Sequence, residues 1–176
     1  MFDFGFEEVF GANIVSNTYE NGQGKIVFDG VVTKIGSESF FGRTRLTSII
    51  IPEGVSVIKH NAFDECENLT EIVLPSSLTK IESAAFLYCS ISSITIPNSV
   101  IEIEDRVFAL CRNLTNVNIP NGITHIAEGL FRECESLVHN TLPDSITEID
   151  DSAFEGCNSL NDINIPNNVS RIGDGA

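Results

Sequence analysis

The chain has 176 residues, of which 42% are apolar, and a formal net charge of −15 at pH 7. A negative charge of this size argues against binding to nucleic acid or to an anionic membrane, because both need basic surface. No apolar run is long enough to span a bilayer, and the N-terminal residues, with Asp3, Glu7 and Glu8, lack the basic start and apolar stretch of a signal peptide. We expect that an export signal has been removed or that the sequence is a fragment.

One period runs through most of the sequence. All prolines and all cysteines recur at intervals of 22 or 23 residues. These residues are Pro52, Pro75, Pro97, Pro120, Pro143 and Pro166, and Cys66, Cys89, Cys111, Cys134 and Cys157. A period of this length predicts a solenoid, in which each unit buries its apolar face only against its neighbours. The regular repeat leaves no place for a linker, so we expect one elongated body.

The first unit in chain order begins at Gln23 and is degenerate. Asp29 replaces its proline and Arg43 replaces its cysteine. Its apolar columns hold Ile26, Phe28, Val32, Ile35 and Phe40. Such a departure is typical of a terminal capping coil, whose outer side faces water.

The regular units begin at Leu46, Leu69, Ile91, Leu114, Leu137 and Leu160, and positions are numbered from these residues. The alternation Leu-x-x-Ile-x-Ile at positions 1–6 predicts a strand with position 5 facing outward. Proline at position 7 ends the strand and starts a turn, and Val-x-x-Ile at positions 10–13 predicts a short second strand. The following Asp/Glu-x-Ala-Phe-x-x-Cys predicts one helical or 3₁₀ turn with the acidic residue as its N-cap. The expected fold is a β-rich α/β repeat.

The pattern Leu-Thr-x-Ile-x-Ile-Pro-x-x-Val-x-x-Ile-x-x-x-Ala-Phe-x-x-Cys closely resembles the BspA-like class of leucine-rich repeats. The resemblance implies a curved solenoid over residues 23–176, with about six to seven coils of which the last is incomplete. It also implies a sheet on one side and irregular or short helical segments on the other. Residues 1–22, which include Phe-Gly-Ala-Asn-Ile-Val-Ser-Asn-Thr-Tyr-Glu-Asn-Gly, resemble the N-terminal capping segment of such proteins.

The family is associated with surface or secreted proteins that adhere to host extracellular-matrix proteins and to other cells. The resemblance therefore implies a non-catalytic protein-binding or adhesion module, located at the cell surface or secreted, with a protein ligand. It carries no catalytic residues over. Two alternatives stay open. One is a structural spacer rod that holds another domain away from a surface, and the other is an intracellular interaction scaffold, which suits unpaired cysteines and a missing signal peptide.

The last unit stops at Ala176, which holds position 17, one residue before the expected phenylalanine. The apolar residues of this unit would then lack a cap. We expect that end to fray or to associate end-to-end with another copy of the chain.

The cysteines occupy a single column, at position 21. An odd number of cysteines in a secreted-looking protein indicates disulfides with one thiol left over, or else a ladder of buried thiols. We favour the ladder, because free cysteine packs as a small hydrophobe. Metal binding is not expected, since ligands placed one coil apart along a line cannot enclose a tetrahedral ion. No cofactor is expected either.

The candidate ligand-binding residues lie at positions 3 and 5, on the outward side of the first strand. In the later coils these positions form a polar patch of two columns: Asn116, Asn118, His139, Thr141, Asp162 and Asn164. Extended faces of this kind are how solenoids bind their ligands. The alternative is a solvated sheet face that is polar only because water requires it. We expect a partner with basic character, since the net charge favours it.

Two further groups of polar residues carry weaker expectations. Acidic residues recur at position 15, as Asp105, Glu128, Asp151 and Asp174, which invites a cation or a basic partner, although helix N-capping explains them more simply. The three histidines, His60, His125 and His139, hold different positions in different coils, so none can serve as the base of a neighbouring nucleophile. We therefore do not expect an enzyme.

Overall fold

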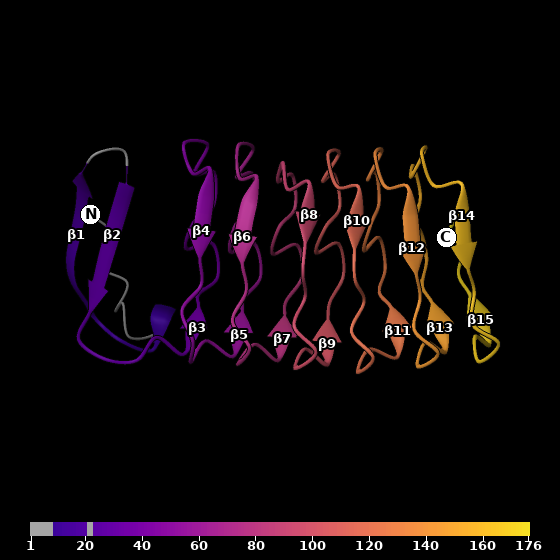
Figure 1. Ribbon diagram of the computed structural model, residues 1–176, viewed down its shortest axis with the longest axis horizontal. Coiled ribbons are helices and arrows are strands. Elements are labelled where there is room, and N and C mark those ends of the chain that lie inside the picture. Colours follow the sequence, from indigo (N-terminus) through magenta and orange to yellow (C-terminus); the bar gives the residue numbers. More distant parts are fainter. Residues whose placement is uncertain (1–8, 21–22) are drawn as a thin grey trace.

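The computed structural model describes residues 9–20 and 23–176, and Figure 1 shows them as a row of coils stacked along one axis. Each coil passes through two short strands, so two columns of strands run along the molecule. The first column contains β4 (Ser48–Ile50), β6 (Glu71–Val73), β8 (Ser93–Ile94), β10 (Asn116–Val117), β12 (His139–Thr141) and β14 (Asp162–Asn164). The second contains β3 (Lys34–Ile35), β5 (Val57–Ile58), β7 (Lys80–Ile81), β9 (Glu102–Ile103), β11 (His125–Ile126), β13 (Glu148–Ile149) and β15 (Arg171–Ile172).

The strands of each column pair in parallel, and each residue pairs with its equivalent one coil away. Ile49 of β4 faces Ile72 of β6, and Asn116 of β10 faces His139 of β12. In the regular units the first strand cannot extend through position 7, because the proline there has no N–H to give to the ladder. This register places equivalent positions of successive units in one straight column. Both strands predicted for each regular unit are present.

An antiparallel hairpin replaces the first strand of the degenerate unit. β1 (Ile14–Glu20) pairs with β2 (Gln23–Phe28), and the hairpin stands beside β4 in Figure 1. The second strand of this unit belongs to the solenoid, since Ile35 pairs with Ile58 of the next coil. The side chain of Phe10 lies against the rings of Phe28 and Phe40, with centroids 5.2 and 6.4 Å away. Residues 1–8 and 21–22 of the expected capping segment lie outside the described residues.

Both strand columns are interrupted once in the middle of the chain. The first column divides between β6 and β8, which follow each other across the one short unit, where Ser90 alone separates Cys89 from Ile91. The second column divides one coil later, between β9 and β11. The coil that begins at Ile91 is therefore joined by only one strand ladder to each of its neighbours.

The expected helical or 3₁₀ turn is not found, and residues 23–176 contain strands, turns and bends without a helix. Positions 16 and 20 of the coils adopt left-handed backbone conformations, as in Asn61 (φ 52°) and Glu65 (φ 58°). A left-handed residue at every fourth position prevents an α-helix, which needs right-handed dihedrals throughout. The segment is instead a run of turns.

These turns form a third ladder between coils. The N–H of Phe63 donates to the carbonyl of Ala85 in the next coil at 2.9 Å, and the N–H of Glu65 donates to Leu87 at 3.0 Å. In a helix the same groups would bond within their own segment. The turn conformation thus exchanges local hydrogen bonds for bonds that hold neighbouring coils together.

A stack of phenylalanine rings fills the interior at position 18. The rings of Phe40, Phe63, Phe86, Phe108, Phe131 and Phe154 follow one another with centroids 5.0–5.9 Å apart and interplanar angles of at most 22°. The middle four are completely buried. Burial of each such side chain contributes about 1.5–3 kcal/mol, and a ring gains full burial only between two others. Stability therefore depends on the stacking of coils.

The cysteines form the expected ladder of free thiols. Each Sγ donates a hydrogen bond to a phenylalanine carbonyl of the preceding coil, as Cys111 does to Phe86 at 3.1 Å and Cys134 to Phe108 at 3.1 Å. Burial raises the pKa of the Cys111 thiol to about 12. These thiols are packed as part of the core and are poor nucleophiles.

Candidate binding face

The outward side chains of the first strand column form one face along the solenoid. The described side chains at position 4 point toward the core, as Val117 does with 3% of its surface exposed, whereas those at positions 3 and 5 point to solvent. The pairing register sets Asn116 beside His139, His139 beside Asp162, and Thr141 beside Asn164. Parallel neighbours in a ladder lie about 4.8 Å apart. The structure therefore brings the backbones of these predicted residues together on one face.

The predicted residues differ in how free their side chains are. Asn116, Thr141, Asp162 and Asn164 are exposed. The side chain of Asn118 is held by the neighbouring strand, because its Oδ1 accepts from the N–H of Ile96 at 2.9 Å and its Nδ2 donates to the carbonyl of Ile96 at 2.9 Å. The side chain of His139 lies outside the described part of the structure. Whether any of these residues contacts a ligand stays a prediction.

The same face is apolar in the early coils. Ile50 of β4 and Val73 of β6 pair with each other and are 76% and 56% exposed. Beside them lie Ser48 and Glu71, which are also exposed and paired. Sequence reasoning gave the binding role to the polar half alone, although the apolar residues at position 5 of these two units already marked a second half. The face thus changes from apolar to polar along the chain.

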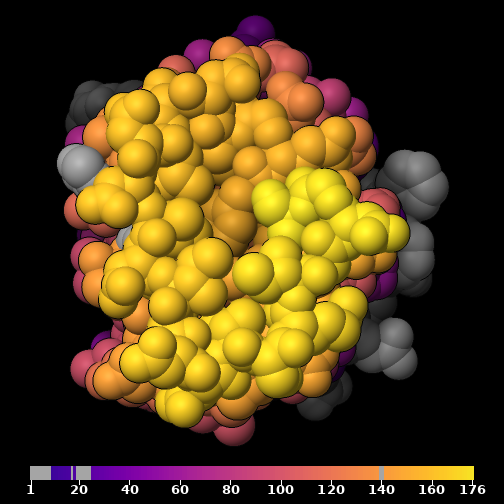
Figure 2. All heavy atoms as spheres, turned by 90° about the vertical axis from the view of Figure 1, so that its right-hand side faces the viewer, coloured from indigo at the N-terminus to yellow at the C-terminus, as the bar shows by residue number. Residues whose placement is uncertain are grey.

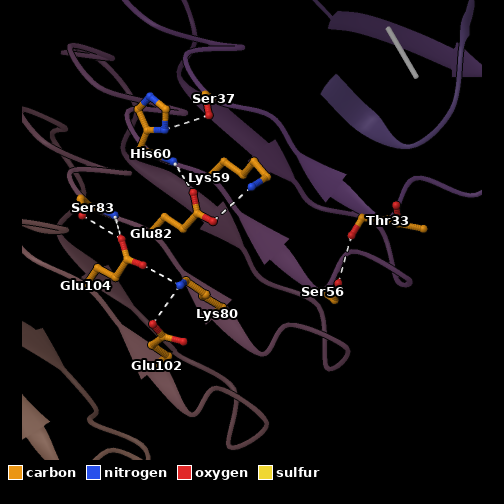
Figure 3. A network of polar contacts seen from close by, with 10 residues as sticks. All are labelled: Thr33, Ser37, Ser56, Lys59, His60, Lys80, Glu82, Ser83, Glu102 and Glu104. Carbon is orange, nitrogen blue, oxygen red and sulfur yellow. Dashed lines mark hydrogen bonds and ion pairs between the residues drawn. The ribbon is translucent and has the colours of Figure 1, made fainter. Parts of the chain in front are cut away.

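A network of ion pairs lies along the second strand column (Figure 3). Lys59 contacts Glu82 of the next coil at 3.2 Å, and Lys80 contacts Glu102 at 2.8 Å and Glu104 at 2.6 Å. Four further pairs also join neighbouring coils, of which Arg171–Glu148 lies on the second strand column and the other three lie in the turns and return loops: Arg106–Glu128, Arg112–Glu135, Arg132–Glu155 and Arg171–Glu148. The spacing of 22 to 24 residues between basic and acidic partners was the sequence signal for these pairs. They fix the register of the coils.

The acidic residues next to the turns cap neighbouring coils instead of a helix of their own. Glu82 accepts from the N–H of His60 at 3.2 Å, and Glu104 accepts from the N–H and the Oγ of Ser83 at 2.9 and 2.8 Å (Figure 3). Asp151 similarly accepts from the N–H of Asp174 at 2.9 Å. Helix N-capping was the favoured interpretation of Asp151, but turns follow it in place of a helix, and its hydrogen bond joins two neighbouring coils.

The last described coil leaves an apolar hollow of about 230 Å³ at its end, visible in the centre of Figure 2. Its walls are Ile149, Phe154, Cys157, Leu160, Ile163, Ile165, Ile172 and Ala176. The expected end-to-end self-association would use this surface and stays a prediction.

The described residues hold no group of three His, Cys, Asp or Glu side chains arranged to hold a metal ion. Nor does that part of the chain include a helix long and apolar enough to cross a membrane. His60 is hydrogen-bonded through Nδ1 to Ser37 Oγ at 2.9 Å, whereas His125 belongs to β11, several coils away. The Ser37 hydroxyl and the His60 ring therefore lie within hydrogen-bond distance on the exposed surface, which corrects the expectation that no histidine lies beside a nucleophile.

The stacked coils, with two parallel strand columns and a buried phenylalanine stack, define a leucine-rich-repeat solenoid. The model of the BspA type leucine rich repeat region matches residues 13–90 and 79–176, with 6 copies. The chain belongs to this family. The fold class and the resemblance expected from the sequence are thereby confirmed, except for the helical turn.

Solved structures of bacterial repeat proteins resemble the chain. The leucine-rich-repeat protein of T. pallidum is 34% identical, with a TM-score of 0.79 over 82% of this chain and 69% of that chain. A leucine-rich-repeat protein from Bacteroides ovatus is 27% identical, with a TM-score of 0.70 over 93% of this chain and 55% of that one. The pneumococcal vaccine antigen PcpA shares the fold at 20% identity and a TM-score of 0.56, over 82% of this chain and 40% of that one. None of the curated proteins compared with this chain matches it.

Proposed function

We propose that the chain is a non-catalytic protein-binding module that uses the outward face of its first strand column. The observation that supports this proposal is the face itself, on which the described side chains at positions 3 and 5 are exposed, whereas those at position 4 are buried or half-buried. Repeat proteins bind through extended faces of this kind. We further propose a location at the cell surface or outside the cell, as the resemblance to the BspA type of leucine-rich repeat implies.

The partner is a protein with basic surface, with extracellular-matrix proteins or other cell-surface proteins as candidates. The net charge of −15 supports this choice, because it steers basic ligands toward the chain and repels acidic ones. The chain offers a wide face with few deep features, so affinity should come from area and should fall as salt is added.

The test compares purified fibronectin, laminin and collagen for binding to the wild type and to the double variant Asn116→Arg, Asn164→Arg. Both asparagines are exposed on the face. The matched control is Asn113→Arg, Asn158→Arg, which makes the same change at two exposed asparagines in the return loops, away from the strands. Loss of binding by the first variant alone supports the proposal. Equal binding by the wild type and both double variants would mean that the contact lies elsewhere. If none of the three forms binds a matrix protein, the spacer rod is favoured.

A second pair of variants asks which half of the face makes the contact. Ile50→Arg and Val73→Arg change the apolar half, where large exposed side chains are the better candidates for contacts that dominate affinity. A loss with these variants and none with the asparagine variants would move the site to the early coils.

A further inference from the structure

Asp64 is the one charged side chain that is buried in the described part of the molecule, with 7% of its surface exposed. It holds position 19, which is occupied by Phe41 in the coil before it and by Leu87 in the coil after it. A carboxylate has thus been placed in a column that is apolar on both sides. Burial of a charge without a partner is costly.

One oxygen of the Asp64 carboxylate lacks a partner that would compensate for this burial. Its Oδ1 makes no hydrogen bond within the described structure. Its backbone is fully engaged, since the N–H donates to Asn61 at 3.2 Å and the carbonyl accepts from the N–H of Gly42 at 2.8 Å. The unsatisfied polar atom of Asp64 is therefore the carboxylate Oδ1.

The charged groups around Asp64 come from three coils. Glu38 from the preceding coil and Glu65 from its own coil repel the carboxylate. Arg43 of the preceding coil interacts electrostatically with the Cys66 thiol. Burial and, to a lesser extent, the charge of Asp64 raise the pKa of the buried Cys89 thiol in the following coil.

Burial, followed by repulsion from Glu65 and Glu38, raises the pKa of Asp64 to about 6. The N–H of Glu65, which donates to Leu87, opposes this shift without cancelling it. Burial, the missing partner and the flanking carboxylates all favour the protonated form.

We propose that Asp64 is a proton-binding switch that makes the early coils more stable in mildly acidic solution than at neutral pH. In the unfolded chain an aspartate titrates near 3.9, below its value in the folded chain. As the pH falls through about 6, the folded chain takes up a proton that the unfolded chain does not, so stability rises. The gain is complete once the pH falls below the unfolded value.

The experiment measures the thermal midpoint of unfolding at about pH 7.5 and about pH 5 for the wild type and for Asp64→Asn. The variant is close in shape to the protonated side chain, so its midpoint should exceed that of the wild type at neutral pH and should rise less on acidification. Asp144→Asn is the matched control, because it removes the same charge from an exposed side chain. The control should keep the full acid-induced rise, which also corrects for the general relief of repulsion among acidic residues.

A direct titration keeps the proposal testable if the variant does not fold. The carbon-13 resonance of the Asp64 carboxyl in the wild type should change with a midpoint near 6. A midpoint near 3.9, or an acid-induced rise in Asp64→Asn equal to that of Asp144→Asn, would overturn the proposal.

Discussion

Asn118 hydrogen-bonds both backbone groups of Ile96, its Oδ1 accepting from the N–H and its Nδ2 donating to the carbonyl, each at 2.9 Å. In a regular parallel ladder a neighbouring backbone makes these bonds. β10 ends at Val117, and the side chain that follows takes over the role of the missing strand residue. A residue that appeared to offer its amide to a ligand thus holds two coils together.

We expect Asn118→Leu to lower the free energy of unfolding by roughly 1–3 kcal/mol, because two backbone groups of Ile96 lose their partners. Asn118→Asp should lose only the donated hydrogen bond, so its free energy of unfolding should lie between those of the wild type and Asn118→Leu. Asn116→Leu is the control, since its exposed side chain has no hydrogen bond within the described structure. Urea unfolding measures all three. An equal loss for Asn118→Leu and Asn116→Leu would contradict the structural role.

Because position 16 of the turns is left-handed, we expect substitutions to and from glycine at this position to change stability in opposite directions. Ala84 (φ 56°) and Gly129 (φ 58°) both hold position 16. Left-handed dihedrals cost an L-residue roughly 1–2 kcal/mol, and glycine avoids the cost. Ala84→Gly should therefore be neutral or stabilising, whereas Gly129→Ala should destabilise by about 1 kcal/mol. Two losses of similar size in denaturant unfolding would show that chain entropy, and not the dihedral, controls the site.

The same column shows where sequence reasoning reached its limit. The period, the strands and the inward columns were predictable, because burial recurs at the same positions in every unit, as with Ile58 and Phe63. The turn conformation was not, because residues such as Glu38, Ala84 and Arg106 hold the left-handed positions and carry no glycine signature. The role of Asn118 was hidden for a related reason. An asparagine that faces solvent and one that bonds a neighbouring backbone look alike in a polar column.

The thiol ladder predicts that all five cysteines are unreactive in the native protein and become reactive on unfolding without reductant. Cys157 should react first, since it is half-buried whereas the other four are buried. Thiolate, the reactive form, is scarce at about pH 8 for such groups. Thiol titration with and without denaturant tests this expectation. Fewer than five free thiols in denaturant would indicate disulfides.

The ion pairs of Lys80 predict a pH dependence opposite to that of Asp64. The Glu104 carboxylate accepts from Lys80 at 2.6 Å and from the N–H of Ser83 at 2.9 Å. Partial burial opposes ionisation of Glu104, but these hydrogen bonds outweigh it and lower its pKa below the ordinary value. A lowered folded pKa gives stability that is present above the unfolded pKa and is lost as the pH falls through the folded one.

We therefore expect Glu104→Gln to destabilise the protein by about 1 kcal/mol at neutral pH, because Lys80 and Ser83 lose a charged acceptor. The difference from the wild type should shrink as the pH falls through the lowered folded pKa and vanish where the carboxyl of the folded wild type is protonated as well. Glu67→Gln makes the same chemical change at an exposed side chain and should leave stability unchanged at both pH values. Urea midpoints at neutral and acidic pH measure the effect. A Glu104→Gln deficit that persists undiminished in acid would mean that the side chain acts through packing, with its charge playing no part.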